Sequence, residues 1–158
     1  MKPNLGIADK NRQGSVEILN QLLSDEYVLY TKLRNYHWNV TGSNFNELHK
    51  LFESQYEEVN EVVDEVAERA RSLGGLALGS LKEFMANTKL KETPGAFLGA
   101  KKMIANLLAD HETVIRSLRK NLEICLDEFK DMGTSDFLTG LMEQHEKMAW
   151  MLRAFLEK

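Results

Sequence analysis

Four side chains between positions 49 and 68 combine metal-binding residue types with a regular spacing. They are His49, Glu53, Asp64 and Glu68. An α-helix turns by about 100° per residue, so these positions fall at roughly 0°, 40°, 60° and 100° around its axis. An imidazole and three carboxylates therefore share one stripe. The stripe flanks the apolar face of the predicted helix, so we expect these side chains to face solvent or another molecule.

The length of this stripe excludes a single metal centre within one chain. At 1.5 Å per residue, His49 and Asp64 are about 22 Å apart along the helix axis, beyond the reach of ligands around one metal. If two copies of the helix packed antiparallel about a two-fold axis, residues whose numbers have a constant sum would lie side by side. His49 and Glu68 give the sum 117. Glu53 and Asp64 give the same sum. The spacing therefore predicts two identical clusters across a dimer, which His37 is well placed to join.

The ligand types in these clusters indicate iron chemistry. Imidazoles and carboxylates suit Fe(II), and carboxylate oxygens favour Fe(III) still more, so such a site would promote oxidation. Carboxylates repel one another without a cation, and metal binding would therefore support dimer formation. Zinc could bind the same ligands. A different interpretation stays open on spacing alone, because acidic residues beside an apolar stripe are usually a solvated helix face.

Apolar residues that recur at intervals of three and four predict four long helices to position these side chains. The first runs from Ser15 to about Trp38. The second follows the N-cap Asn44, with Glu47 completing a capping box, and its apolar stripe stops at the glycine pair 74–75. Its predicted core positions are Leu48, Phe52, Val59, Val62, Val63, Val66, Ala70 and Leu73.

The second half of the chain carries its own helix signals. Ser80 with Glu83 predicts a capping box on a short helix that ends near Ala86. Thr93 before Pro94 predicts the start of the third long helix, whose apolar stripe begins at Phe97 and which runs to about Lys130. The fourth follows Gly133, is capped by Thr134 or Ser135, and ends the chain.

These elements predict an all-α fold, a four-helix bundle with a short extra helix in the connection between the second and third long helices. That connection is long enough to cross the bundle, which permits a ferritin-like topology. We expect a flexible N-terminal tail over residues 1–14 and a single bundle domain over residues 15–158.

Composition limits the partners and the compartment. The N-terminus has no apolar stretch of signal-peptide length, and no later apolar segment is long enough to span a membrane. The sequence is therefore typical of a cytoplasmic protein. Cys125 is the only cysteine, which excludes an intrachain disulfide and favours a core role in a reducing compartment. A net charge of −4 argues against general affinity for DNA, and leaves the tail residues Lys2, Lys10 and Arg12 as a weak local anchor.

A family resemblance adds to this interpretation. The stretch NYHWNVTGSNFNELHKLFESQYEEVNEVVDEVAERARSLGG closely resembles the signature region of the Dps family, the mini-ferritins named as DNA-binding proteins from starved cells. Later landmarks are ADHETVIRSLR, GTSDFL and HEKMAWMLRAFL, so the resemblance spans nearly the whole chain. The Glu-x-x-His motif of ordinary ferritin is absent, because Arg34, Asn46, Leu108 and Met142 stand three residues before the four histidines.

The resemblance implies a ferroxidase that oxidises Fe(II), preferably with hydrogen peroxide, and stores ferric mineral inside a hollow dodecamer, which protects DNA from oxidative damage. It implies two irons at each two-fold interface. One subunit supplies His37, His49 and Glu53, and its partner supplies Asp64 and Glu68. An alternative stays open: a non-specific DNA-compacting protein, associated with the nucleoid, whose main work is physical shielding.

Several further residues have expected roles that rest on weaker signals. The resemblance suggests that Trp38 intercepts one-electron oxidants near the iron, although packing at an interface is an equally good explanation. It also suggests that acidic pores are lined from the region of Asp127, Asp131 and Asp136, where negative charge would attract Fe(II). Helix ends commonly carry acids for other reasons. His111 and His145 fall on apolar faces and are expected to be hydrogen-bonded core histidines.

Overall fold

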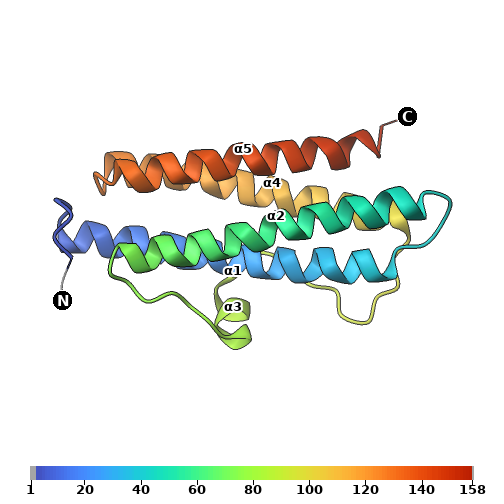
Figure 1. Cartoon of the computed structure of the whole chain (residues 1–158), viewed down its shortest axis with the longest axis horizontal. Coiled ribbons are helices and arrows are strands. Elements are labelled where there is room, and N and C mark those ends of the chain that lie inside the picture. Colours follow the sequence, from blue (N-terminus) through green and yellow to red (C-terminus); the bar gives the residue numbers. More distant parts are fainter. Residues whose placement is uncertain (1–2, 158) are drawn as a thin grey trace.

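The computed structural model describes residues 3–157, and within that range it contains helices and no strand. The helices are α1 (Asp9–Asn39), α2 (Phe45–Ser72), α3 (Leu81–Asn87), α4 (Ala100–Asp127) and α5 (Met132–Ala154). The hairpin α1–α2 lies along the hairpin α4–α5, and α3 lies outside the bundle on the long connection (Figure 1). The predicted four-helix bundle with a short extra helix is confirmed.

Each long helix is amphipathic and contributes one face to a common core. On α2 the predicted core positions are all buried except Val63, which is half-buried. Cys125 is also buried, and burial raises the pKa of its thiol to about 11, consistent with its expected core role. The opposite faces are polar, and across residues 3–157 no helix combines the length and the apolar character that crossing a bilayer requires.

The first helix is longer at its N-terminal end than the sequence predicted. It begins at Asp9, ahead of the expected start at Ser15, so residues 9–14 are helical. Pro3 and the guanidinium group of Arg12 approach Gly74, and Arg12 donates a hydrogen bond to the carbonyl of Leu73. The described part of the tail is therefore docked on the end of α2. Lys2 lies outside the described residues, and the flexibility of the tail stays a prediction.

The predicted start of the third long helix at Thr93 and Pro94 is wrong. Residues 93–96 instead form a turn in which the N–H of Ala96 donates to the carbonyl of Thr93 at 3.3 Å. Gly95 has a φ of +72°, outside the helical region, and glycine adopts this conformation without strain. The Pro-Gly pair thus makes a turn, α4 begins only at Ala100, and Phe97 is 94% exposed instead of buried.

Helix caps agree with the sequence in part. The capping box of Ser80 and Glu83 is present on α3. Asn44 is the N-cap residue of α2, but its side chain makes no capping hydrogen bond. The cap of α5 is Asp131 and not Thr134 or Ser135: the Asp131 carboxylate accepts a hydrogen bond from the backbone N–H of Thr134 at 3.0 Å. A carboxylate also interacts favourably with the helix dipole at this position.

Candidate metal centre

The candidate metal centre is built around two histidines where α1 ends and α2 begins. His37 lies in the last turn of α1 and is buried, and His49 lies near the start of α2 and is half-buried. Residues 40–44 reverse the chain between them. The two imidazole rings stack, with centroids 3.8 Å apart and 20° between the ring planes. The fold of one chain thus brings His37 and His49 together.

Reciprocal hydrogen bonds to the backbone fix the orientation of both rings. Nδ1 of His37 lies 2.8 Å from the carbonyl oxygen of His49, and Nδ1 of His49 lies 2.9 Å from the carbonyl oxygen of His37. A carbonyl oxygen can only accept, so each Nδ1 carries a proton and donates it. In the neutral imidazole, each Nε2 then has a free lone pair. Hydrogen bonds of this kind orient the ligating histidines of metal sites.

A carboxylate and a phenol lie beside this histidine pair. Glu53 follows His49 by about one helical turn and is half-buried. The Tyr56 hydroxyl lies 3.5 Å from Oε1 of Glu53, and its ring meets the ring of His37 edge-on, with centroids 5.3 Å apart. Burial raises the pKa of Tyr56, and the charges of Glu53 and Glu57 raise it further. The phenol therefore stays protonated and can donate to Glu53.

A cation and two more aromatic rings border the same region. The Cζ atom of Arg34 lies 5.1 Å from the ring centroids of both Trp38 and Tyr56 and 5.6 Å from that of Tyr30. An Nη1 of Arg34 also donates to the Tyr30 hydroxyl at 2.7 Å. These contacts are cation–π interactions. Trp38 is 64% exposed, which leaves its ring accessible in the single chain, and its role against oxidants stays a prediction.

Sequence reasoning did not find Arg34 and Tyr56, although the pattern carried a signal for both. Tyr30, Arg34 and Trp38 are spaced by four residues on α1, so they share a helix face. Tyr56 is three residues after Glu53, on the same side of α2.

The remaining predicted ligands lie elsewhere on α2. Asp64 and Glu68 are exposed, toward the C-terminal end of the helix, and helical geometry separates Asp64 from His49 by about 22 Å. Within residues 3–157 of one chain, no three side chains of His, Cys, Asp or Glu come close enough to hold a metal ion. The chain therefore brings His37 and His49 into contact, places Glu53 about one helical turn from His49, and leaves Asp64 and Glu68 apart. Completion by a partner subunit stays a prediction.

The acidic residues predicted near a pore have different surroundings. Asp127 and Asp136 are exposed. Asp131 is 2% exposed, caps α5 and pairs with Arg69 at 3.2 Å. Burial acts to raise its pKa, but hydrogen bonds from Thr134 outweigh that effect and the pKa is lowered. Asp131 thus caps α5 and pairs with Arg69 inside the subunit, and the pore-lining role of Asp127, Asp131 and Asp136 stays a prediction.

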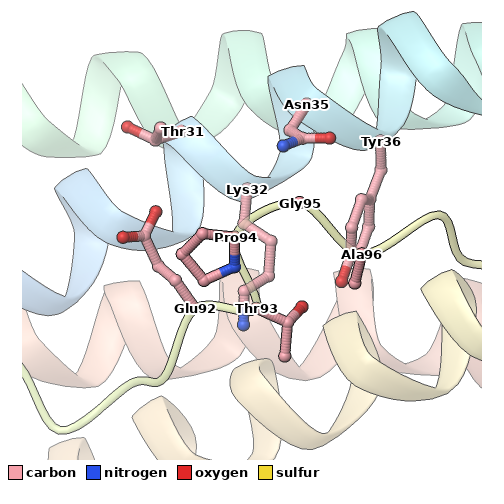
Figure 2. A pocket seen from close by; sticks show the side chains of 9 residues that line it. All are labelled: Thr31, Lys32, Asn35, Tyr36, Glu92, Thr93, Pro94, Gly95 and Ala96. Carbon is pink, nitrogen blue, oxygen red and sulfur yellow. The ribbon is translucent and has the colours of Figure 1, made fainter.

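A separate groove of about 370 Å³ lies between α1 and the residue 92–96 turn. In Figure 2, Lys32 and Tyr36 extend from α1 toward the segment that carries Thr93, Pro94 and Ala96. Nζ of Lys32 donates to Asp110 and to the carbonyl of Lys91, both at 2.6 Å. Lys32 thereby attaches the connection between α3 and α4 to the bundle. No residue of the candidate metal centre lines this groove.

A four-helix bundle with one long crossover connection is the architecture of the ferritin-like proteins. Residues 16–158 match the Ferritin family, described as a ferritin-like domain. The chain is 50% identical over 154 residues to a low temperature-induced protein of Nostoc sp., covering 98% of this chain and 86% of that one.

Two further comparisons define the branch of the ferritin-like class. The chain is 38% identical to DNA protection during starvation protein 2 of Bacillus anthracis, over 90% of this chain and 97% of that protein. The Dps protein of Vibrio cholerae, whose structure is described as a member of a broad superfamily of ferritin-like diiron-carboxylate proteins, superimposes with a TM-score of 0.91 at 30% identity, over 99% of this chain and 98% of that chain. The chain belongs to the Dps family.

Proposed function

We propose that this chain is a ferroxidase subunit that oxidises Fe(II), preferably with hydrogen peroxide, at sites shared between two subunits. Copies of the chain assemble into a hollow dodecamer in the cytoplasm, which stores the ferric product as mineral and protects DNA from oxidative damage. Membership of the Dps family and the likeness to a diiron-carboxylate protein support this proposal. Iron is the substrate here, and two irons bind at each site.

The reciprocal bonding of His37 and His49 is the observation that carries the proposal. Both Nδ1 protons are committed to backbone carbonyls, which leaves two Nε2 lone pairs on adjacent rings. A solvated helix face would not need such fixed tautomers. Glu53 adds an oxygen ligand one turn away, and Tyr56 can hold its carboxylate in place. The pair is thus pre-organised for a metal ion before any iron arrives.

The partner's half of the site follows from the spacing on α2. In an antiparallel dimer of this helix, the partner subunit's Asp64 and Glu68 would approach Glu53 and His49. Their negative charge favours Fe(III) over Fe(II), which drives oxidation. Two Fe(II) ions give one electron each to hydrogen peroxide, which takes up two protons and leaves as two water molecules. Zinc binds the same types of ligand and would compete with iron without being oxidised.

Asp127 and Asp136 extend the proposal to iron entry. Both carboxylates are exposed near the junction of α4 and α5, so they are free to line an acidic pore where subunits meet. Negative charge at such a pore would raise the local Fe(II) concentration.

The test is an anaerobic Fe(II) titration followed by peroxide addition. The double variant Asp64→Ala, Glu68→Ala should assemble and yet lose fast iron oxidation, because each site loses its partner-derived carboxylates. The matched control is Glu58→Ala, Glu65→Ala, which removes two charges from another face of the same helix. Equal oxidation rates in both double variants would contradict the shared site.

DNA shielding is the second candidate, because relatives of this chain are named for DNA protection. The described part of the tail offers little positive charge for DNA binding. Arg12 is bonded to Leu73 and paired with Asp9 at 3.0 Å, which leaves Lys10 as the exposed cation of the described tail. DNA binding should therefore be weak, non-specific and sensitive to salt. A gel retardation assay at low salt tests this. The absence of a mobility shift would exclude shielding by bound protein.

A further inference from the structure

A second group of titratable side chains lies in the core of the bundle, apart from the metal centre. Glu26 of α1, His111 of α4 and His145 of α5 are each 0% exposed. Nδ1 of His111 lies 3.0 Å from Nδ1 of His145, and Nε2 of His145 lies 3.0 Å from Oε1 of Glu26. The three side chains thus form a line, carboxylate to imidazole to imidazole, that joins three helices.

Several polar atoms of this line have no hydrogen-bond partner. The contact between Glu26 and His145 has the distance of an ion pair but lacks the alignment of a hydrogen bond, so both oxygens of Glu26 stay without a donor. Nε2 of His111 is also buried without a partner. Buried polar groups are nearly always satisfied, so unsatisfied atoms at one level of a core require an explanation.

The geometry fits a bound proton better than a bound metal ion. His145 directs one nitrogen at Glu26 and the other at His111, so the three side chains do not converge on a common point. This agrees with the absence of any three-ligand metal cluster in the described chain. Two facing Nδ1 atoms at 3.0 Å require one proton between them, because one nitrogen must donate and the other accept.

The arrangement of the protons follows from the carboxylate. If His111 donates its Nδ1 proton to His145, then Nε2 of His145 carries a proton that faces Glu26, which is electrostatically favourable. The opposite arrangement would set a bare nitrogen against the carboxylate. In the favoured arrangement, Nε2 of His111 is the unprotonated atom. A further proton would bind there, where it would create a buried N–H without an acceptor.

The charged groups around this line come from the neighbouring helices. On α1 and α4, Lys32 pairs with Asp110 at 2.6 Å, next to His111 in the sequence. The α1 neighbour Asp25 is bonded to Thr88 and Lys89. From α2, Gln55 donates to the carbonyl of Met148, one turn beyond His145, and carries no charge. The pairs Arg119–Glu146 and Arg153–Glu112, between α4 and α5, lie at the surface. No other described group pairs with His111 or His145.

We propose that Glu26, His145 and His111 form an acid-sensing site in the bundle core, which holds one proton between its imidazoles at neutral pH and can take up a further proton only when the packing of α1 against α4 and α5 opens, so that acid favours the opened state. The site is independent of iron oxidation. The ligand of this site is a proton, and the response is a change in the packing of the helices.

The direction of the response follows from the burial of His111. Burial and the neighbouring His145 hold the pKa of His111 well below its usual range. The unfolded chain, with an ordinary histidine pKa near 6.5, therefore binds this proton first as the pH falls. The contribution of neutral His111 to the free energy of unfolding is therefore fully present above about pH 6.5 and is lost as the pH falls below that value. One extra proton on the unfolded chain raises the unfolding equilibrium constant by about tenfold per pH unit.

The experiment compares the pH dependence of unfolding in assembled, metal-free protein. Urea unfolding of wild type, His111→Gln and the control Glu146→Gln is measured between pH 7.5 and 5. Glutamine can still donate to His145 but does not titrate, so His111→Gln should lose about tenfold per pH unit of the acid response. Glu146→Gln removes an exposed carboxylate from α5 and should keep the response.

A second measurement covers the case in which His111→Gln does not fold. Hydrogen exchange of wild type should show the protection factors of amides around positions 111 and 145 falling as the pH drops from 6.5 to 5, ahead of those at the α1–α2 turn. Uniform or pH-independent protection would overturn the proposal, as would equal slopes in all three proteins. Stabilisation by added zinc that depends on His111 would also overturn it, in favour of a metal site.

Discussion

The chain contains four histidines, arranged as two pairs whose chemistry is opposite. In the surface pair, His37 and His49 each donate from Nδ1 to the other's backbone carbonyl, and both Nε2 atoms keep a free lone pair. In the core pair, the Nδ1 atoms of His111 and His145 face each other, and Nε2 of His145 faces a carboxylate. The two pairs therefore differ in the partner of Nδ1: a backbone acceptor leaves Nε2 of each ring free for the proposed metal, and a second ring requires a proton between the two nitrogens.

The largest effect should come from removing the middle of the core line. His145→Ala leaves the carboxylate of Glu26, which is 0% exposed, without the imidazole that faces it and opens a cavity beside it. Losing the partner of a buried polar group and creating a core cavity together cost about 3–5 kcal/mol in the free energy of unfolding. Chemical denaturation at pH 7 measures the loss. A loss under about 1 kcal/mol would show that the core pair is less important to the fold than its burial indicates.

The corresponding change in the surface pair should affect activity more than stability. His49→Ala removes one ligand and also the donor to the carbonyl of His37. We expect peroxide-driven Fe(II) oxidation to fall by more than about 100-fold, while the assembly persists. Stopped-flow absorbance of the ferric product follows the rate, and size-exclusion chromatography confirms the assembly. Normal oxidation in this variant would place the site elsewhere.

The smallest effect concerns the group that supports the surface pair. Tyr56→Phe removes a hydroxyl 3.5 Å from Glu53 and retains the ring that contacts His37. A long hydrogen bond of this kind contributes little, so zinc affinity measured by calorimetry should fall by about threefold. Tyr36→Phe is the control, because its hydroxyl bonds to Asn106 on the other side of α1. If both variants bind zinc as wild type does, Tyr56 has no role in holding Glu53.

Periodicity predicted the bundle well because each long helix has an apolar stripe. The errors arose where local chemistry competes with helix formation. Thr93 and Pro94 match a helix start, yet Gly95 turns the chain before a helix can form. The sequence favours Thr134 or Ser135 as the cap of α5, because it does not show that the Asp131 carboxylate accepts a hydrogen bond from the N–H of Thr134 and pairs with Arg69.

The candidate site could be predicted only as far as one helix determines it. The stripe on α2 follows from residue spacing, and the pairing of His37 with His49 required only a short loop. The tautomers could not be predicted, since they depend on two carbonyl groups placed by the α1–α2 turn. The core line joins three helices, and no spacing within one helix indicates that Glu26 faces His145.

The contact between Gly75 and Val16 has a consequence for how such chains can vary in length. A Cβ atom on Gly75 would lie 2.3 Å from Cγ1 of Val16, so α2 ends in direct contact with the early part of α1. The histidine bonds attach the other end of α2 to α1, a helix length of about 40 Å away. Adding or deleting one residue between these attachments would rotate one of them by about 100°. Insertions should therefore accumulate in the connection after α3 and be absent from α2.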